Sequence, residues 1–242
     1  AVNQQIFWMA EVEGEPAAAI GAHLGLTVSA IKAQQVALSA TVSIPTIAAS
    51  AFGGPGNVPT APASRLGAAT SVEAADLKFM REEEKLARDV YLKLNEHFDL
   101  AIFANISASE QRHMDSVLNL LVKYRIADPV AAHPIGVFAD EELQALYNQL
   151  IATGSTDVTS GVRVGALIEE VDLEDLNTAA ANTVKSDIDR VYSNLACGSR
   201  NHLRSFAYTL KTLTGNAYVA QKLPQATVDA ILATPMERCG AN

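Results

Sequence analysis

The chain is short of cysteine, aromatic residues and positive charge, and each shortage excludes a class of protein. Its 242 residues include two cysteines and 6% aromatics, and 27 acidic residues outnumber 18 basic ones for a net charge of −9. Two cysteines cannot build a disulfide framework and lack the paired spacing of a zinc site. An acidic chain without a Lys/Arg cluster is poorly suited to nucleic acid, and no apolar run reaches the roughly 18 residues of a membrane-spanning helix. We therefore expect no nucleic-acid partner and no transmembrane segment.

Charge is scarcest at the N-terminus. Residues 1–70 contain five charged residues and end on a stretch rich in Gly and Pro. We predict an apolar arm and linker over 1–70, a helical bundle over 71–222, and a short helix and tail over 223–242. The arm packs either on its own domain or on neighbouring subunits, which would build a homo-oligomer or filament. The first residue, Ala1, indicates a processed chain and an extracellular or cell-surface location.

Beyond residue 70 the apolar residues recur with helical spacing. Thr70-Ser71-Val72-Glu73 is the pattern of a capping box, which opens a helix. Long helices are expected over about 70–97, 101–125, 159–180 and 183–213, and shorter ones over about 139–152 and after Pro224. Four long helices with a short one between the second and third predict an all-α four-helix bundle with a long crossover.

The inner face of each long helix is apolar except near its middle. The polar residues there are Glu84 on the first helix, Glu110 and His113 on the second, Glu170 on the third and His202 on the fourth. Buried carboxylates are unfavourable unless they are paired or bind a cation. Ferritin-like dimetal bundles use a Glu from each of two helices and a Glu-x-x-His from each of the other two. These five residues are therefore predicted metal ligands; the alternative is a metal-free core in which they satisfy one another.

Four segments follow one another within residues 72–222: Met80–Tyr91, Asn105–His113, Val164–Glu170 and Gly198–Arg204. Together they resemble a ferritin-like family called domain of unknown function 2202, which is distantly related to rubrerythrins and bacterioferritins. The resemblance implies a ferritin-like fold and a non-haem centre of one or two iron ions, with manganese or no metal as alternatives. The family has no known reaction, so oxygen or peroxide chemistry, such as a ferroxidase or peroxidase reaction, is expected from the metal-carboxylate ligand set itself.

One position departs from the rubrerythrin pattern. Ser199 stands where those proteins carry the glutamate of a second Glu-x-x-His, which leaves five ligands instead of six and weakens one site. Glu174, one turn beyond Glu170, would partly compensate for the missing glutamate.

Other polar residues are given structural roles. Arg200 and Arg204 are expected to pair with Asp172 or Glu174. Whether Cys197 bridges to Cys239 is left open, since a bridge requires export. A solvated, salt-bridged helix face is expected for Glu82, Glu83, Lys85, Arg88 and Asp89.

Two functions follow from these observations. The first is a metal-carboxylate protein with the chemistry described above. The alternative is a secreted structural subunit that uses a catalytically silent bundle as a building block and the arm over 1–70 as its connector.

Overall fold

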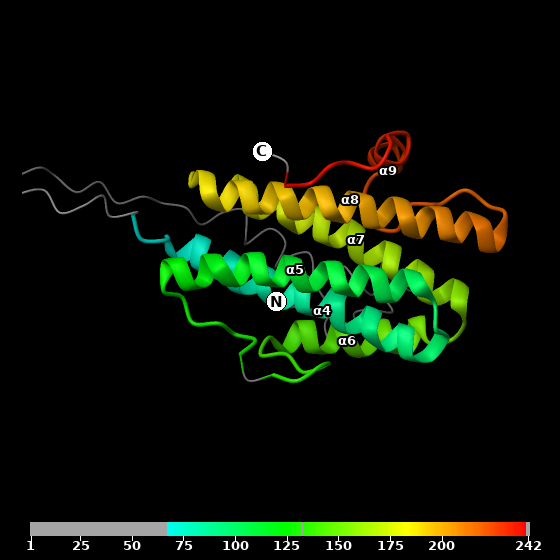
Figure 1. The fold of residues 1–242 in the computed structure, drawn as a ribbon, viewed down its shortest axis with the longest axis horizontal. Helices are drawn as coiled ribbons and strands as arrows, with labels where there is room; N and C mark the ends of the chain where they lie inside the picture. Colours follow the sequence, from blue (N-terminus) through cyan, green and yellow to red (C-terminus); the bar gives the residue numbers. More distant parts are fainter. Residues whose placement is uncertain (1–66, 132, 241–242) are drawn as a thin grey trace, which may run out of the picture. The chain divides into compact units, whose positions relative to one another are not determined.

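The computed structural model describes residues 67–131 and 133–240 of the chain. Within these ranges every regular element is a helix (Figure 1): α4 Ser71–Phe98, α5 Ala101–Tyr124, α6 Glu141–Gly154, α7 Val158–Ala181, α8 Ser186–Thr214 and α9 Gln225–Leu232. The all-α prediction is confirmed, and each helix lies close to its predicted bounds. The arm predicted over 1–70 falls almost wholly outside the described residues. Of the described helices, none has both the length and the apolar character needed to cross a bilayer.

The helix ends follow local side-chain chemistry. At the start of α4, Glu73 N donates to Thr70 Oγ1 at 3.1 Å and Thr70 N donates to Glu73 Oε2 at 2.8 Å, which completes the predicted capping box. Asp140 and Asp157 cap α6 and α7 through their carboxylates, which accept hydrogen bonds from backbone N–H groups of the first turn. Gly215 ends α8 with φ 75°, a left-handed conformation that glycine adopts without strain.

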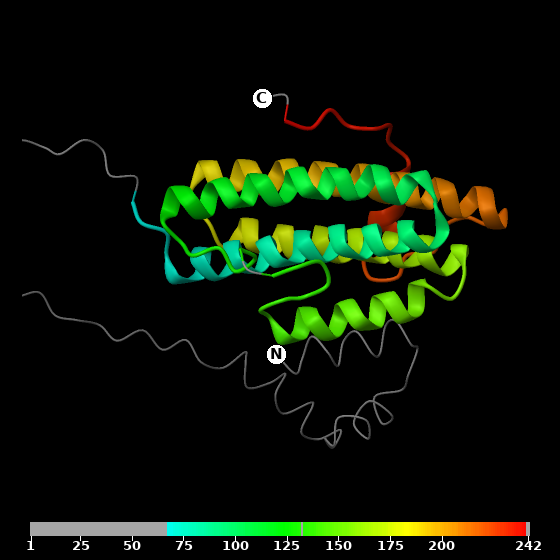
Figure 2. The same ribbon diagram turned by 60° about the horizontal axis from the view of Figure 1, so that its bottom comes forward.

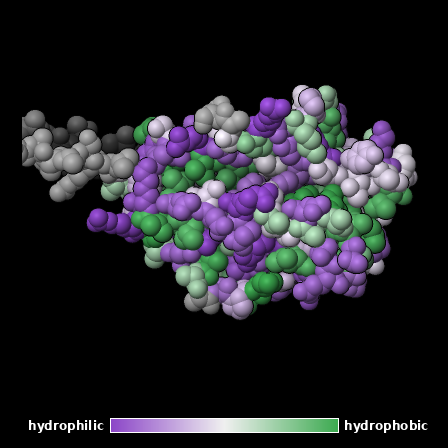
Figure 3. All heavy atoms as spheres, in the orientation of Figure 1, coloured by the Kyte–Doolittle hydropathy of each residue, from purple (hydrophilic) through white to green (hydrophobic). Residues whose placement is uncertain are grey.

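The four long helices form two antiparallel hairpins, α4 with α5 and α7 with α8, which pack together as a bundle (Figures 1 and 2). The crossover between the hairpins carries α6, which packs against α4 and α7, while α9 packs against α8. The outer face drawn in Figure 3 intersperses hydrophilic and hydrophobic residues. This arrangement directs one face of each long helix toward a common interior.

The interior is apolar toward both ends of the bundle. Near one end Leu77, Val117 and Tyr192 are shielded from solvent. Toward the other end the rings of Tyr91 and Phe206 lie 5.3 Å apart and those of Phe103 and Phe206 lie 6.0 Å apart. These two apolar layers separate the polar middle of the bundle from water.

The crossover is attached to α4 through a buried ammonium group. Lys85 is fully buried and binds the Asp89 carboxylate. Its Nζ also donates to the Pro134 carbonyl at 2.8 Å and lies 4.3 Å from the centroid of the Phe138 ring. Asp89 in turn accepts a hydrogen bond from Gly136 N at 2.9 Å. The charge on α4 thus orders the loop that covers it.

The prediction of a solvated face on α4 is therefore wrong. Glu82, Glu83, Lys85 and Asp89 are each at most 5% exposed. Glu82 Oε1, for example, accepts a hydrogen bond from Ala139 N at 2.6 Å. The crossover and α6 lie over this face, and helical periodicity alone cannot foresee a cover supplied by another element.

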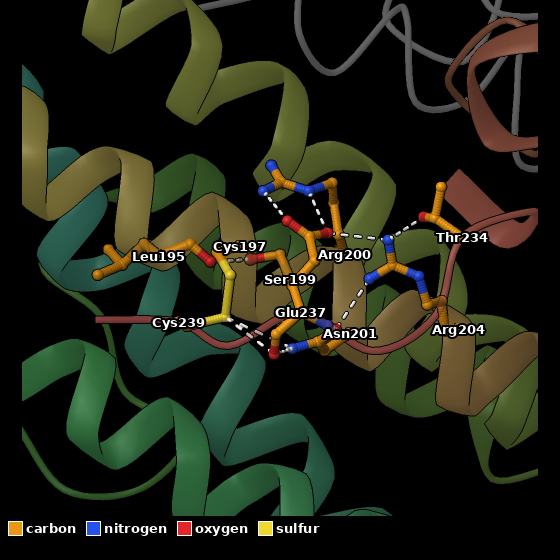
Figure 4. Close-up of a disulfide and its surroundings, with 9 residues drawn as sticks. All are labelled: Leu195, Cys197, Ser199, Arg200, Asn201, Arg204, Thr234, Glu237 and Cys239. Carbon is orange, nitrogen blue, oxygen red and sulfur yellow. Dashed lines mark hydrogen bonds and ion pairs between the residues drawn. A yellow bond between two sulfur atoms is a disulfide. The ribbon is translucent and has the colours of Figure 1, made fainter. Parts of the chain in front are cut away.

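The C-terminal tail is fastened along α8, and Cys239 forms a disulfide with Cys197 (Figure 4). The Glu237 carboxylate accepts hydrogen bonds from Arg200 Nε at 2.8 Å and from an Arg204 terminal nitrogen, also at 2.8 Å. The backbone carbonyl of Glu237 accepts from the side chain of Asn201 at 3.0 Å.

This tail corrects the predicted pairing of the two arginines. Arg200 and Arg204 bind Glu237 rather than Asp172 or Glu174, because the tail folds back over the outer face of α8. The bridge between the two cysteines, which the sequence left open, is present.

Removal of the Asp89 carboxylate is expected to destabilise the protein strongly. Asp89→Ala leaves the Lys85 charge buried without its partner, so the free energy of unfolding should fall by about 3–5 kcal/mol in urea titrations. Lys93→Ala is the matched control, because Lys93 pairs with Glu96 at the exposed surface, where solvent screens the pair, and its removal should leave stability nearly unchanged. Equal losses in both variants would contradict this account of Lys85.

Reduction of the disulfide is expected to lower stability without removing the helices. The two cysteines are 42 residues apart, and closing a loop of this size stabilises a fold by about 2–4 kcal/mol. Thermal unfolding with and without a phosphine reductant measures the effect, and a variant with both cysteines changed to serine should not respond to the reductant. An unchanged melting temperature in the wild type would contradict the prediction.

Candidate metal centre

Two overlapping groups of carboxylates and imidazoles lie in the middle of the bundle. The first contains Glu84, Glu110 and His113, and the second contains Glu110, Glu169 and His202. In each group the three potential ligand atoms all lie within 4.8 Å of one another. Every long helix contributes to one of the groups, and Glu110 belongs to both.

The first group joins α4 to α5. His113 Nδ1 lies 2.7 Å from Glu110 Oε2 and 3.2 Å from Glu84 Oε2. The three-residue spacing of Glu110 and His113 places both side chains on one face of α5. On its other side the His113 ring abuts Gly198 of α8, where an added Cβ would lie 2.5 Å from His113 Nε2. Glycine at this position therefore leaves room for the imidazole.

The second group joins α5 to α7 and α8. His202 Nδ1 lies 2.8 Å from Glu110 Oε1 and 3.3 Å from Glu169 Oε2. These contacts are ion pairs whose angles do not meet those of a hydrogen bond. The two imidazoles are roughly parallel, with their centroids 5.5 Å apart. Both direct Nδ1 at the carboxylates and carry a proton there, which a bound cation would displace.

The structure brings together four of the five predicted ligands, Glu84, Glu110, His113 and His202, but places Glu170 elsewhere. Glu170 accepts hydrogen bonds from the Tyr218 hydroxyl at 2.5 Å and from the backbone N–H groups of Lys222 and Leu223, both at 2.7 Å. It fixes the segment after α8 rather than facing the centre.

Glu169 takes the place predicted for Glu170. The error is one of helical phase, because α7 is buried on two sides and its apolar pattern does not mark the inner one. A usable signal was Gly165, one turn before Glu169, where an added Cβ would lie 2.4 Å from a Phe206 ring carbon. Glu174, the predicted substitute ligand, instead pairs with Lys222 at 2.6 Å.

A fully buried tyrosine holds the Glu169 carboxylate in position. The Tyr91 hydroxyl donates to Glu169 Oε1 at 2.6 Å, and it lies 3.2 Å from the carbonyl oxygen of Gly165. Burial, followed by the charge of Glu169, raises the pKa of Tyr91 well above its usual value, so the hydroxyl keeps its proton. Tyr91 therefore leaves Glu169 Oε2 directed at His202.

Carboxyl groups outnumber imidazoles in this interior. Glu83 and Asp172, which were not predicted as members of the centre, are also buried near it. Burial raises the pKa of Glu84 to about 7 against the opposing attraction of His113. Burial and repulsion between neighbouring carboxylates, Glu84 first, raise the pKa of Asp172 well above its usual range. The interior thus holds more potential negative charge than its own imidazoles can balance.

Glu110 and its histidines behave in the opposite way. Burial disfavours the Glu110 charge, but His202 and His113 outweigh it and hold the pKa of Glu110 below its ordinary value. Burial also disfavours charge on His202, yet Glu110 and Glu169 raise the pKa of His202 to about 10. These three side chains form a charged unit within a ring of destabilised carboxyl groups.

The residues present fit a divalent cation. Among the described residues, Glu84 Oε1 and Asp172 Oδ1 are buried without a hydrogen-bond partner, whereas Glu110 Oε1 and His202 Nδ1 face each other at 2.8 Å. Buried polar atoms are normally paired, and unpaired ones in a core of oxygen and imidazole donors are what a bound metal would satisfy.

A pocket of about 420 Å³ opens beside the two imidazoles. It is lined by His113 and His202 and by polar residues such as Arg112. Glu237 and Cys239 of the C-terminal tail form another part of its wall. A small reactant would therefore reach the histidine side of the centre between α5, α8 and the tail.

The stability of the metal-free protein is expected to fall as the pH rises. The pKa of Glu84 rises from 4.5 to about 7, so its unfavourable charge develops across that window. The pKa of His202 rises from 6.5 to about 10, so its stabilising charge is present below 6.5 and is lost toward 10. Both groups bind more protons in the folded state, so both act in the same direction.

Urea midpoints of chelator-treated protein between about pH 5 and pH 10 measure this slope. His202→Gln should flatten it above pH 6.5, since the variant has no imidazole to lose its proton there. Ser205, on the same helix as His202, supplies the control, because Ser205→Ala removes no titratable group and should keep the wild-type slope. Parallel curves for the wild type and His202→Gln would contradict the charged unit described above.

Comparison with known proteins assigns the domain. The family model described as an uncharacterized protein domain, DUF2202, matches residues 73–235. The uncharacterized protein MJ0754 of Methanocaldococcus jannaschii is 45% identical over 159 residues, which span 66% of this chain and 85% of that protein. The crystal structure of the hypothetical protein MJ0754 matches with a TM-score of 0.67 and 41% identity, covering 75% of this chain and all of that one.

Proposed function

The chain belongs to the DUF2202 family, and we propose that its bundle is a non-haem metal-carboxylate protein that binds one or two iron ions. The observation that supports this most directly is the excess of buried carboxylate around the Glu110–histidine unit: among the described residues, Glu84 Oε1 and Asp172 Oδ1 are buried and have no hydrogen-bond partner. A core without a cation would leave these groups unsatisfied, which is unfavourable by about 1–3 kcal/mol for each group.

Glu84 with His113 would hold one ion, and Glu169 with His202 would hold the other. Glu110 lies between them, with one oxygen near each histidine, and would bridge the pair. A carboxylate shared by two such groups is the arrangement of dimetal centres in four-helix bundles. Glu170 is not part of this proposed set.

Imidazole nitrogen and carboxylate oxygen together suit iron, and they also accept manganese. Bound iron would supply redox exchange with oxygen or peroxide, the chemistry of a ferroxidase or peroxidase. The chain's own contribution is to exclude water and to fix the ligands. Tyr91 donates to one oxygen of Glu169 and so keeps the other oxygen facing His202. The pocket beside the histidines would admit a small oxidant.

The disulfide supports an extracellular or cell-surface location. Bridges between cysteines persist mainly outside the reducing cytosol, and this one fastens the tail that lines the pocket.

The proposal predicts that protein purified without chelator carries about two iron ions per chain, measured by elemental mass spectrometry after anaerobic incubation with ferrous iron. Glu110→Gln should lose both ions, because the two groups share this carboxylate. Glu170→Gln should keep both, since Glu170 is also buried but lies on α7 next to Glu169 and faces the segment 218–223. A wild-type chain with no metal after this incubation would contradict the proposal.

A further inference from the structure

The two helices that carry the histidines differ in the residue three positions before the histidine. On α5, Glu110 precedes His113 by three residues, whereas on α8 Ser199 precedes His202 by the same interval. Three residues of helix return a side chain to the same face, so Ser199 faces the centre at the level where Glu110 lies on α5. Its hydroxymethyl group is too short to supply the carboxylate that Glu110 supplies.

A carboxylate from another helix fills this position. Asp172 lies on α7, three residues after Glu169 and therefore on the same inner face. The hydroxyl of Ser199 donates to Asp172 Oδ2, and Ser199 itself is completely buried. The Asp172 carboxylate thus lies against Ser199, the α8 residue that corresponds to Glu110 of α5.

The free oxygen of Asp172 belongs to the same polar interior as the two groups. Asp172 is 6% exposed, and Oδ1 has no hydrogen-bond partner among the residues that the structure describes. Carboxylates that repel it include Glu84 of α4, Glu110 of α5 and Glu169 of its own helix. Glu84 Oε1 is likewise buried and unpaired. A cation would satisfy both unpaired oxygens, which another acceptor cannot do.

We propose that Asp172, oriented by the Ser199 hydroxyl, supplies the sixth ligand of the centre in place of the glutamate that α8 lacks. The inference rests on the proposed function, since it adds a ligand to the same centre. It assigns Ser199 a positioning role: the hydroxyl holds Oδ2 and leaves Oδ1 to the cation. Ser199 in place of a glutamate then costs the centre no ligand. The centre keeps six protein ligands, because α7 supplies two of them.

The test compares wild type, Asp172→Asn, Ser199→Ala and a control, Glu170→Gln, in anaerobic titrations with ferrous iron. Bound iron is counted after desalting, and the affinity for each ion is obtained from the titration. Asp172→Asn keeps the shape of the side chain but lacks the anionic oxygen, so it should lose one ion or bind the weaker ion at least about 10-fold less tightly. Ser199→Ala should weaken the same ion by about 10-fold, as removal of an outer-shell hydrogen bond does at other metal sites.

The control and the metal-free state separate ligation from folding. Glu170 is also a buried carboxylate on α7, but it binds the Tyr218 hydroxyl and the backbone N–H of Lys222, so Glu170→Gln should bind iron as the wild type does. Without metal, Asp172→Asn should melt no lower than the wild type, because the neutral amide avoids the repulsion that the carboxyl group meets when it ionises. A folded Asp172→Asn protein with wild-type iron number and affinity would overturn the inference and leave the proposed function intact. A wild type that binds no iron would overturn both.

Discussion

The Glu110 carboxylate lies between two imidazoles, 2.7 Å from His113 Nδ1 and 2.8 Å from His202 Nδ1, in the middle of a bundle with apolar layers toward both ends. A charge in such a place is tolerated only when groups of opposite charge are held against it. This requirement fixes how α5 must face α8, because the two histidines come from these two helices. It also sets the environment of the remaining carboxylates. They lie next to Glu110, His113 and His202, whose charges already balance one another.

Charged side chains serve two purposes in this chain, and hydrogen bonding distinguishes them. Lys85 with Asp89, and Arg200 with Glu237, are paired and also hydrogen-bonded, and each pair attaches one segment to the bundle. At the centre, by contrast, oxygens of Glu84 and Asp172 have no partner among the described residues. A pair that is satisfied within the protein is explained by structure alone, whereas an unsatisfied acid points to a ligand.

Much of the fold was predictable because its signals are local. The Thr70–Glu73 capping box, the glycine after α8 and the apolar period of each helix involve residues within a few positions of one another, and all of them are present. The Glu-x-x-His of α5 was equally clear, since its two members lie on the same helical face. The spacing of Glu84 and His202 within their helices was sufficient to place them at the same depth in the bundle.

The choice between Glu169 and Glu170 was not local. Both are buried, and contacts of α7 with distant residues decide which of them faces the histidines: Tyr91 holds Glu169, and the segment 218–223 binds Glu170. The same holds for Asp172, whose position matters only because Ser199 lies across from it on another helix. The sequence by itself determined the helices, their caps and the Glu110–His113 pair, because these depend on spacing within one helix. The tertiary structure alone decided which acids converge, because that depends on contacts between residues far apart in the chain.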